Sequence, residues 1–243
     1  VLEAAYQGVS EALEFYPAED GEKIVVEIYP DARGLASATG LKVSEIAASG
    51  TIAVCKYHRL MITSPLATAN GYAWADTLSH ELVHLIISKK SHNRVPIWLH
   101  EGIAKYYESA WRGPLGDALG AYGEKLLAQG VQENELIAYD AMHPSMAKLP
   151  TQEAAALAFA EVFTTIEFFH KRYGKDAVPK LLDSLRQGLT LNRALEAQFG
   201  LTMRGVEKAW KAYLRKRKYS VVPGAKAHKI FLVSEEKESS EEN

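Results

Sequence analysis

The stretch Ser79-His80-Glu81-Leu82-Val83-His84-Leu85-Ile86-Ile87 places an HExxH pattern inside an apolar run. On a helix, residues four apart lie on one face with Cβ atoms about 5–6 Å apart, so the imidazoles of His80 and His84 can reach one ion. Glu81 lies beside them and could act on a water at that ion. The pattern alone is weak evidence, because a chain with 8 histidines can contain an HExxH sequence by chance. The surrounding sequence must therefore support the interpretation as a metal site.

A second motif supplies a candidate third ligand, which a catalytic zinc site usually needs. The residues directly after the first motif lack the glycine and third histidine of a metzincin, but PIWLHEGIAKYYE follows at 96–108 and contains Glu101. In one straight helix Glu101 would lie about 25 Å beyond His84. We therefore predict a helix over 73–88, a turn over 88–96 and a second helix over 96–109.

The second helix is expected to bury a carboxylate. Ile97, Glu101 and Ala104 share one stripe of this helix, and a buried carboxylate is costly unless it is paired or bound to a metal. Gly102 is expected to let the two metal helices approach closely.

HELVH together with WLHEGIAKYYE resembles the gluzincin metallopeptidases, and in particular the shorter bacterial peptidase MA-like proteins. The resemblance covers about residues 24–214. It implies one zinc ion per chain on His80, His84 and Glu101, with Glu81 as the general base. It also implies an α+β, zincin-like fold, with a small mixed sheet, the two metal helices and a helical C-terminal part. A bacterial exported or periplasmic location is mildly favoured by the same resemblance.

Composition sets broad limits on the function. The chain has 243 residues, 47% hydrophobic residues and a net charge of −2, which is ordinary for a globular protein and gives no sign of nucleic-acid binding. No apolar run approaches the roughly 20 residues that span a bilayer. A single cysteine, Cys55, excludes an internal disulfide framework. The start at Val1, without a methionine, suggests a processed protein or a part of a longer chain with other domains.

We predict one gluzincin-like domain over 1–218, followed by a disordered or linker tail over 219–243 that ends in EEKESSEEN. The domain divides into a sheet-containing part (about 1–72), the metal helices (about 73–109) and a helical part (about 114–218). Helices are expected at 1–15, 113–130, 151–173, 177–186, 192–199 and 203–216, and a strand at 23–29. Residues 31–50 hold two short helical candidates, and 131–150 read as a loop.

Residues 51–63 read as one strand or a hairpin. In zincin folds a strand of this kind forms the edge of the cleft, and the backbone of the substrate pairs along it. An exposed strand edge offers unpaired N–H and C=O groups to an extended peptide. We assign this role to 51–63 as a hypothesis.

The residue that would stabilise the oxyanion formed during peptide hydrolysis departs from the family pattern. Several gluzincins use a tyrosine on the helix that ends at a glycine such as Gly174, but the corresponding position, fifteen residues earlier, is Phe159, whose ring has no donor. Other side chains could substitute, although each is more often a packing or surface residue. They are Tyr106, Tyr107, Tyr122, Tyr139 and His143.

Three further side chains receive expectations. Asp76, four residues before His80, could hold a ligating histidine by a hydrogen bond, as a backbone carbonyl also could. His100 is expected to point away from the metal. Glu161 could face the cleft, but a solvated face is favoured.

Two classes of function follow. The favoured one is a zinc-dependent peptidase that acts on peptide or protein substrates. The alternative is a catalytically weak or inactive zinc domain that serves as a binding or scaffolding module in a larger protein. Phe159 favours the alternative, whereas Glu81 favours the enzyme, because a scaffold needs ligands but no general base. A third reading, a metal-free helical domain, fails if zinc co-purifies at one ion per chain.

Overall fold

A computed structural model describes residues 1–17, 23–44, 46, 50–113, 115–116 and 119–226. Its sheet has the order β1-β3-β2, formed by β1 (Val25–Tyr29), β3 (Arg59–Thr63) and β2 (Ala53–Lys56). β1 is parallel to β3, and β2 is antiparallel to it. Residues 51–63 therefore form the hairpin, with β2 at one edge of the sheet. Tyr57 and His58 between the two strands have φ of 55° and 59°, as a two-residue hairpin turn requires.

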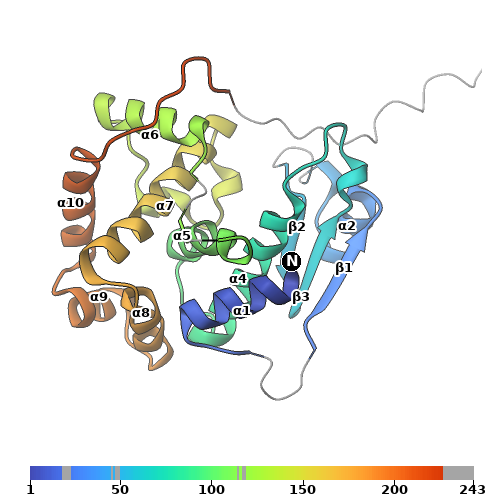
Figure 1. Ribbon diagram of the computed structural model, residues 1–243, viewed down its shortest axis with the longest axis horizontal. Helices are drawn as coiled ribbons and strands as arrows, with labels where there is room; N and C mark the ends of the chain where they lie inside the picture. The colour runs from blue at the N-terminus through green and yellow to red at the C-terminus, as the bar shows by residue number, and fades with distance from the viewer. Residues whose placement is uncertain (18–22, 45, 47–49, 114, 117–118, 227–243) are drawn as a thin grey trace, which may run out of the picture.

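The two faces of the sheet contact different helices, because successive side chains of a strand point to opposite sides. Leu60 and Ile62 of β3 belong to the main hydrophobic core. Met61 points the other way, into a small cluster with Leu35 of α2 (Ala32–Thr39). Figure 1 shows the main helices on one side of the sheet. In the described residues, the sheet thus has α2 and Ile46 on one face and the main hydrophobic core on the other.

The metal helices lie between the sheet and the remaining helices (Figure 1). α4 (Trp74–Ser91) packs against β2, β3 and α5 (Ile97–Tyr107), and α1 (Leu2–Leu13) packs against α4. A short 3₁₀ helix, η2 (Glu108–Trp111), continues α5. α4 runs three residues further than the predicted end at 88, and His92, with φ 54°, ends it. The connection to α5 is accordingly shorter than predicted.

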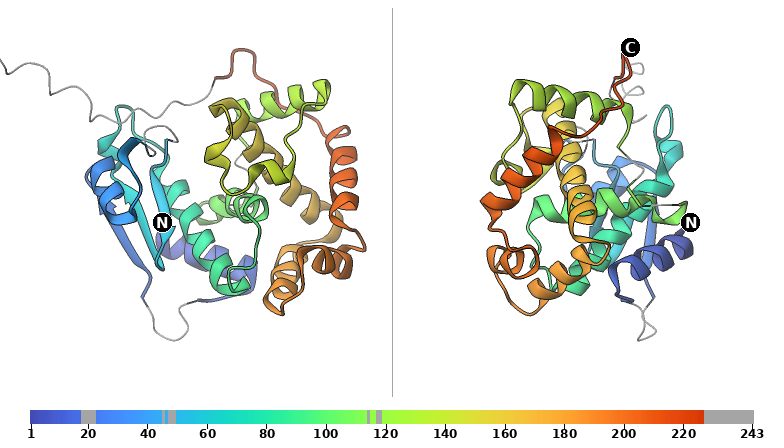
Figure 2. Two further views of the ribbon diagram at one scale, coloured as in Figure 1. Left: turned by 180° about the vertical axis from the view of Figure 1, so that it is seen from behind. Right: turned by 60° about the vertical axis from the view of Figure 1, so that its left-hand side comes forward.

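The C-terminal half is helical, as predicted. Three of its helices have threonine N-caps, at Thr151, Thr190 and Thr202, whose side chains accept a backbone N–H in the first turn. Figure 2 shows these helices from two further sides. The elements are α6 (Ala121–Glu133), α7 (Gln152–Tyr173), α8 (Ala177–Arg186), α9 (Leu191–Phe199) and α10 (Met203–Leu214).

Two boundaries in this half differ from the expectation. α6 begins at Ala121 rather than near 113, because Gly120 is its extended N-cap residue (φ −66°, ψ 165°). The segment read as a loop contains two 3₁₀ turns, η3 (Tyr139–Met142) and η4 (Met146–Lys148). A third such turn, η1 (Pro65–Ala67), follows β3.

Gly102 provides a close approach, but not between the two metal helices. A Cβ at this position would lie 2.8 Å from the backbone oxygen of Val162 in α7 and 3.2 Å from Cγ1 of Ile166. The expectation that Gly102 brings α4 and α5 together is therefore wrong. It allows α5 to contact α7, and α7 in turn supports the helix that carries Glu101.

The observed architecture is mostly helical with a small mixed sheet, in agreement with the predicted α+β class. The buried apolar cluster extends from Ala5 in α1 to Leu214 in α10. None of the helices in the described ranges is long and apolar enough to cross a bilayer. Of the predicted tail only 219–226 is described, and there the N–H of Ser220 donates to Glu124 in α6.

Candidate metal centre

His80 and His84 lie on one face of α4, and Glu101 reaches the same point from α5. Nε2 of His80 is 3.4 Å from Oε2 of Glu101, and Nε2 of His84 is 3.5 Å from the same oxygen. One ligand atom from each residue lies within 4.8 Å of the other two. The turn between α4 and α5 therefore brings together the three residues that the sequence singles out.

The spacing of these atoms fits a single metal ion. Two ligand atoms at about 2.1 Å from a tetrahedral zinc ion lie about 3.4 Å apart. Both nitrogen–oxygen distances agree with this value. Two imidazole nitrogens and one carboxylate oxygen are also a donor set that zinc accepts. The three residues can hold a metal.

Glu108 contacts the other side of the His80 ring. Its Oε2 is 3.1 Å from Nδ1 of His80, and its second oxygen accepts a hydrogen bond from Lys105. Glu108 is only 5% exposed, so this carboxylate stays close to the histidine. When Nδ1–H of His80 donates to Glu108, the lone pair of Nε2 remains available to a metal.

His84 has a different partner, because its Nδ1 lies 2.6 Å from Nδ1 of His100. The rings of His84 and His100 have centroids 4.7 Å apart. His100 contributes no atom to the ligand cluster, which agrees with the expectation that it does not bind the metal. It nevertheless lies directly behind a proposed ligand, a contact that the sequence did not predict.

Burial and close charges alter the pKa values of these groups in the metal-free protein. Burial opposes the charged form of His80, but hydrogen bonds to Glu101 and Glu108 outweigh it and raise its pKa to about 10. Burial acts against ionised Glu101 as well, but the two histidines hold its pKa well below the usual value. Burial lowers the pKa of His100 to about 3, so this imidazole is neutral.

Glu81 lies between the histidines and the free edge of β2. Its side chain is buried, which raises its pKa, and the nearby backbone of Cys55 acts against this shift. Thr63 donates its N–H to the carbonyl of Ile52, so the backbone groups of alternate residues, Ala53 and Cys55, point away from β3. The carboxylate of Glu81 therefore faces the edge strand.

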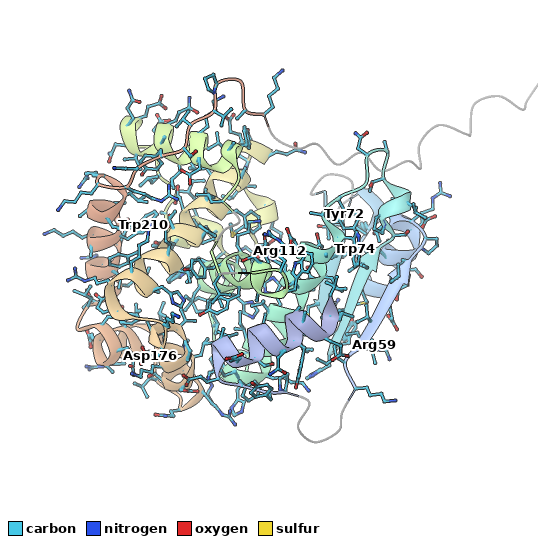
Figure 3. The ribbon with its side chains drawn as sticks, in the orientation of Figure 1. Arg59, Tyr72, Trp74, Arg112, Asp176 and Trp210 are labelled. Carbon is cyan, nitrogen blue, oxygen red and sulfur yellow. The ribbon has the colours of Figure 1, made fainter. Side chains whose placement is uncertain are left out.

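Asp76 does not contact His80 through any hydrogen bond that the structure shows. Its Oδ1 accepts from Nε1 of Trp111 at 2.8 Å and from Nε of Arg112 at 3.0 Å, and Oδ2 accepts from the same guanidinium. In the view of Figure 3 the exposed Arg112 lies between the sheet and the C-terminal helices, and Tyr72 and Trp74 lie beside the sheet. Asp76 thus ties α4 to the end of η2, and Glu108 holds the position beside His80.

Three of the tyrosines named as oxyanion partners are involved elsewhere. The ring of Tyr106 stacks on His170 at 4.9 Å, and the hydroxyl of Tyr107 is 2.9 Å from Nε2 of His170. The hydroxyl of Tyr139 is 2.7 Å from Oγ1 of Thr165. These contacts join α5, η3 and α7 within the core, so they explain the tyrosines as packing residues.

No contact given for the described residues joins the remaining two candidates, Tyr122 and His143, to the ligand cluster. Tyr122 is half-buried on α6, and the charge of Glu153 adds to burial in raising its pKa. His143 is exposed after η3. Neither the described contacts nor the burial of these side chains gives them a catalytic role.

Phe159 and Glu161 occupy different environments on α7. Phe159 is half-buried and packs against the main core, one turn before Val162, which contacts Gly102. Glu161 is fully buried, so the expectation of a solvated face is wrong. Its Oε1 accepts the N–H of Ile137, its Oε2 has no partner among the described residues, and burial raises its pKa to about 8.

The fold and the site define a class: an α+β protein in which an HExxH helix and a neighbouring glutamate form a cluster that could hold a metal, close to the edge strand of a sheet. The chain belongs to the peptidase MA superfamily, because the sequence model of this family matches residues 4–216. Neither curated proteins nor solved structures give a significant match to the chain. The predicted resemblance to the MA peptidases is thereby confirmed.

Proposed function

We propose that this protein is a zinc-dependent peptidase with a zincin-like fold. The observation that carries the proposal is that Nε2 of His80 and Nε2 of His84 each lie from Oε2 of Glu101 at the spacing of two ligands of a tetrahedral site, within one three-residue cluster. Membership in the peptidase MA superfamily supports the same reaction class. The substrate class is a peptide or protein chain.

The proposed roles follow from the position of each group. Zinc, when bound to the three ligands, lowers the pKa of a water towards about 7 and polarises a carbonyl. Glu81 takes the proton of the attacking water and passes it to the leaving amine. Its buried position beside the histidines suits a carboxylate that must hold a proton briefly during the reaction.

The edge of β2 is the proposed binding site for the substrate backbone. In the described residues β2 pairs with β3 on one side only, and the outward groups of Ala53 and Cys55 lie on the other side. An extended peptide can add there as a further strand. Because Glu81 lies close to Cys55, such a peptide would bring a scissile bond close to the general base.

A non-catalytic zinc module is the second candidate, and Phe159 is the observation that favours it. This residue has no hydrogen-bond donor, and the tyrosines that could replace it make other contacts. Loss of an oxyanion donor typically costs about 10²–10³ in turnover. The buried Glu81, which a scaffold does not need, supports the enzyme.

Two variants test the assignment of ligand and base separately. Glu101→Ala is expected to lose zinc, because it removes one of three protein ligands. Glu81→Gln is expected to keep zinc at one ion per chain and to lose peptide hydrolysis. The measurements are zinc content after dialysis and turnover of a peptide substrate. A Glu101→Ala protein that retains stoichiometric, tightly held zinc would contradict the site.

A further inference from the structure

The contact between His84 and His100 joins two ring nitrogens, and this limits where their protons can be. The two Nδ1 atoms are 2.6 Å apart, and the rings are tilted by 31°. An imidazole nitrogen either donates or accepts, so one of the two must carry the proton and the other must present a lone pair. The contact therefore couples the tautomers of the two residues.

Metal binding selects one of the two arrangements. If Nε2 of His84 binds a metal, the proton of this ring is on Nδ1, and it donates to Nδ1 of His100. Because Nδ1 of His100 accepts in this arrangement, the proton of its own ring is on Nε2. That nitrogen is 3.3 Å from Oγ of Ser88, which can accept. Both ring nitrogens of His100 then have a partner.

The chain of hydrogen bonds also links the two metal helices. Ser88 and His84 lie one turn apart on α4, whereas His100 comes from α5 and is adjacent to Glu101. The rotation of α5 that presents Glu101 to the cluster therefore also places His100 behind His84. Ser88 holds the far side of the His100 ring.

We propose that His100 is a positioning residue that fixes the tautomer and ring orientation of His84 for metal binding, and that Ser88 holds His100 in place. The inference rests on the proposed metal function but concerns residues outside the ligand set. It makes the support of the site asymmetric, because Glu108, a carboxylate, orients His80, whereas an imidazole orients His84.

Three variants test the role of His100, with zinc affinity measured by competition against a chelator. His100→Leu keeps a side chain of similar size but removes the acceptor, and zinc should bind about 10- to 100-fold more weakly. His100→Asn places a carbonyl oxygen close to the position of Nδ1, so it should recover most of the affinity. Ser88→Ala should lower the zinc affinity by a smaller factor than His100→Leu does. His92→Asn, which changes an exposed histidine at the end of α4, is the control.

A spectroscopic measurement separates positioning from a general loss of structure. The visible absorption of the Co²⁺-substituted protein should change in His100→Leu and return towards the wild type in His100→Asn. Circular dichroism in excess chelator identifies any variant that does not fold, and in that case Ser88→Ala and His100→Asn decide the question. Zinc affinity and Co²⁺ spectra that are equal in wild type, His100→Leu and Ser88→Ala would overturn the positioning role alone. A wild-type protein that binds no zinc would overturn this inference and the proposed function together.

Discussion

Two histidines on one helix face present four ring nitrogens, and their neighbours decide which of these can hold a metal. In this protein both Nε2 atoms face Glu101, and both Nδ1 atoms have partners behind the ligand cluster. Partners of this kind orient the rings and commonly change metal affinity by about 10- to 100-fold. Substitution of the residues behind the site should therefore change metal affinity by a measurable amount, as substitution of the proposed ligands should.

Glu108 is expected to matter for zinc binding, and Asp76 is not. Glu108→Gln keeps the size of the side chain but removes its charge, so zinc affinity should fall by about 10-fold or more. Asp76→Asn should leave zinc affinity unchanged, because Asp76 bonds to Trp111 and Arg112. The measurement is competition with a chelator for both variants. A loss of affinity in Asp76→Asn, with none in Glu108→Gln, would reverse the assignment.

That His80, His84 and Glu101 lie together could be predicted from the sequence, but the residues behind them could not. The HExxH spacing fixes one helix face, and the cost of a buried carboxylate on the next helix singles out Glu101. Which side chain lies behind each histidine depends on how α5 is rotated against α4. Glu108 follows Glu101 by seven residues, two turns along the same face, and this spacing is the one signal that could have identified it.

At the scale of helices, the contact between α5 and α7 depends on the absence of a side chain at position 102. Gly102→Ala should destabilise the protein by about 1–3 kcal/mol, because the added methyl would meet a backbone carbonyl that cannot rotate away. This cost exceeds the gain of up to about 1 kcal/mol in helix propensity.

Gly113→Ala is a suitable comparison, because a Cβ there meets nothing within 4 Å. Its stability should stay within about 0.5 kcal/mol of the wild type. Urea unfolding in excess chelator compares the three proteins without a contribution from metal. Equal stability of Gly102→Ala and wild type would show that the two helices can separate without cost.

Glu161 on α7 gives a prediction for the pH dependence of stability. Its pKa is about 8 in the folded protein against 4.5 as the ordinary value. Between these pH values the unfolded chain releases the proton and the folded protein keeps it, so the wild type should lose stability as pH rises from about 4.5 to 8. Glu161→Gln cannot ionise at this position. By pH 8 its free energy of unfolding should therefore exceed that of the wild type by an amount on the order of 2–4 kcal/mol.

The free energies of unfolding of wild type and Glu161→Gln, measured in chelator at pH 5 and pH 8.5, check this expectation. The difference between the two proteins should be larger at the higher pH. A difference that is the same at both pH values would mean that Glu161 does not titrate in the folded state.

Local signals predicted the helices, whereas the contacts between helices required the structure. Threonine N-caps fix the starts of α7, α9 and α10, and these starts were predicted closely. α6 lacks such a side-chain cap, and its predicted start was about eight residues early. Gly102 could have faced either α4 or α7. The sequence alone does not show which of the two helices it contacts.

For the whole molecule, the sheet and the helical half together place the candidate site. The sheet supplies an edge strand, α4 supplies two ligands and a carboxylate that faces this edge, and α5 supplies the third ligand with α7 behind it. The two sequence motifs were enough to predict this class of fold, because each motif needs the other to complete a metal site. The hairpin that places β2 at the edge could not be distinguished from a single strand, since one alternating run suits both.

The central claim is that this arrangement hydrolyses peptide bonds. The most direct test is digestion of a broad peptide mixture, read by mass spectrometry, with zinc-loaded wild type and Glu81→Gln prepared in the same way. We predict cleavages that occur with the wild type and not with Glu81→Gln, and the residues around them would begin to define the specificity. No cleavage by the wild type, with zinc confirmed in both proteins, would contradict the claim and favour a zinc domain that binds without hydrolysis.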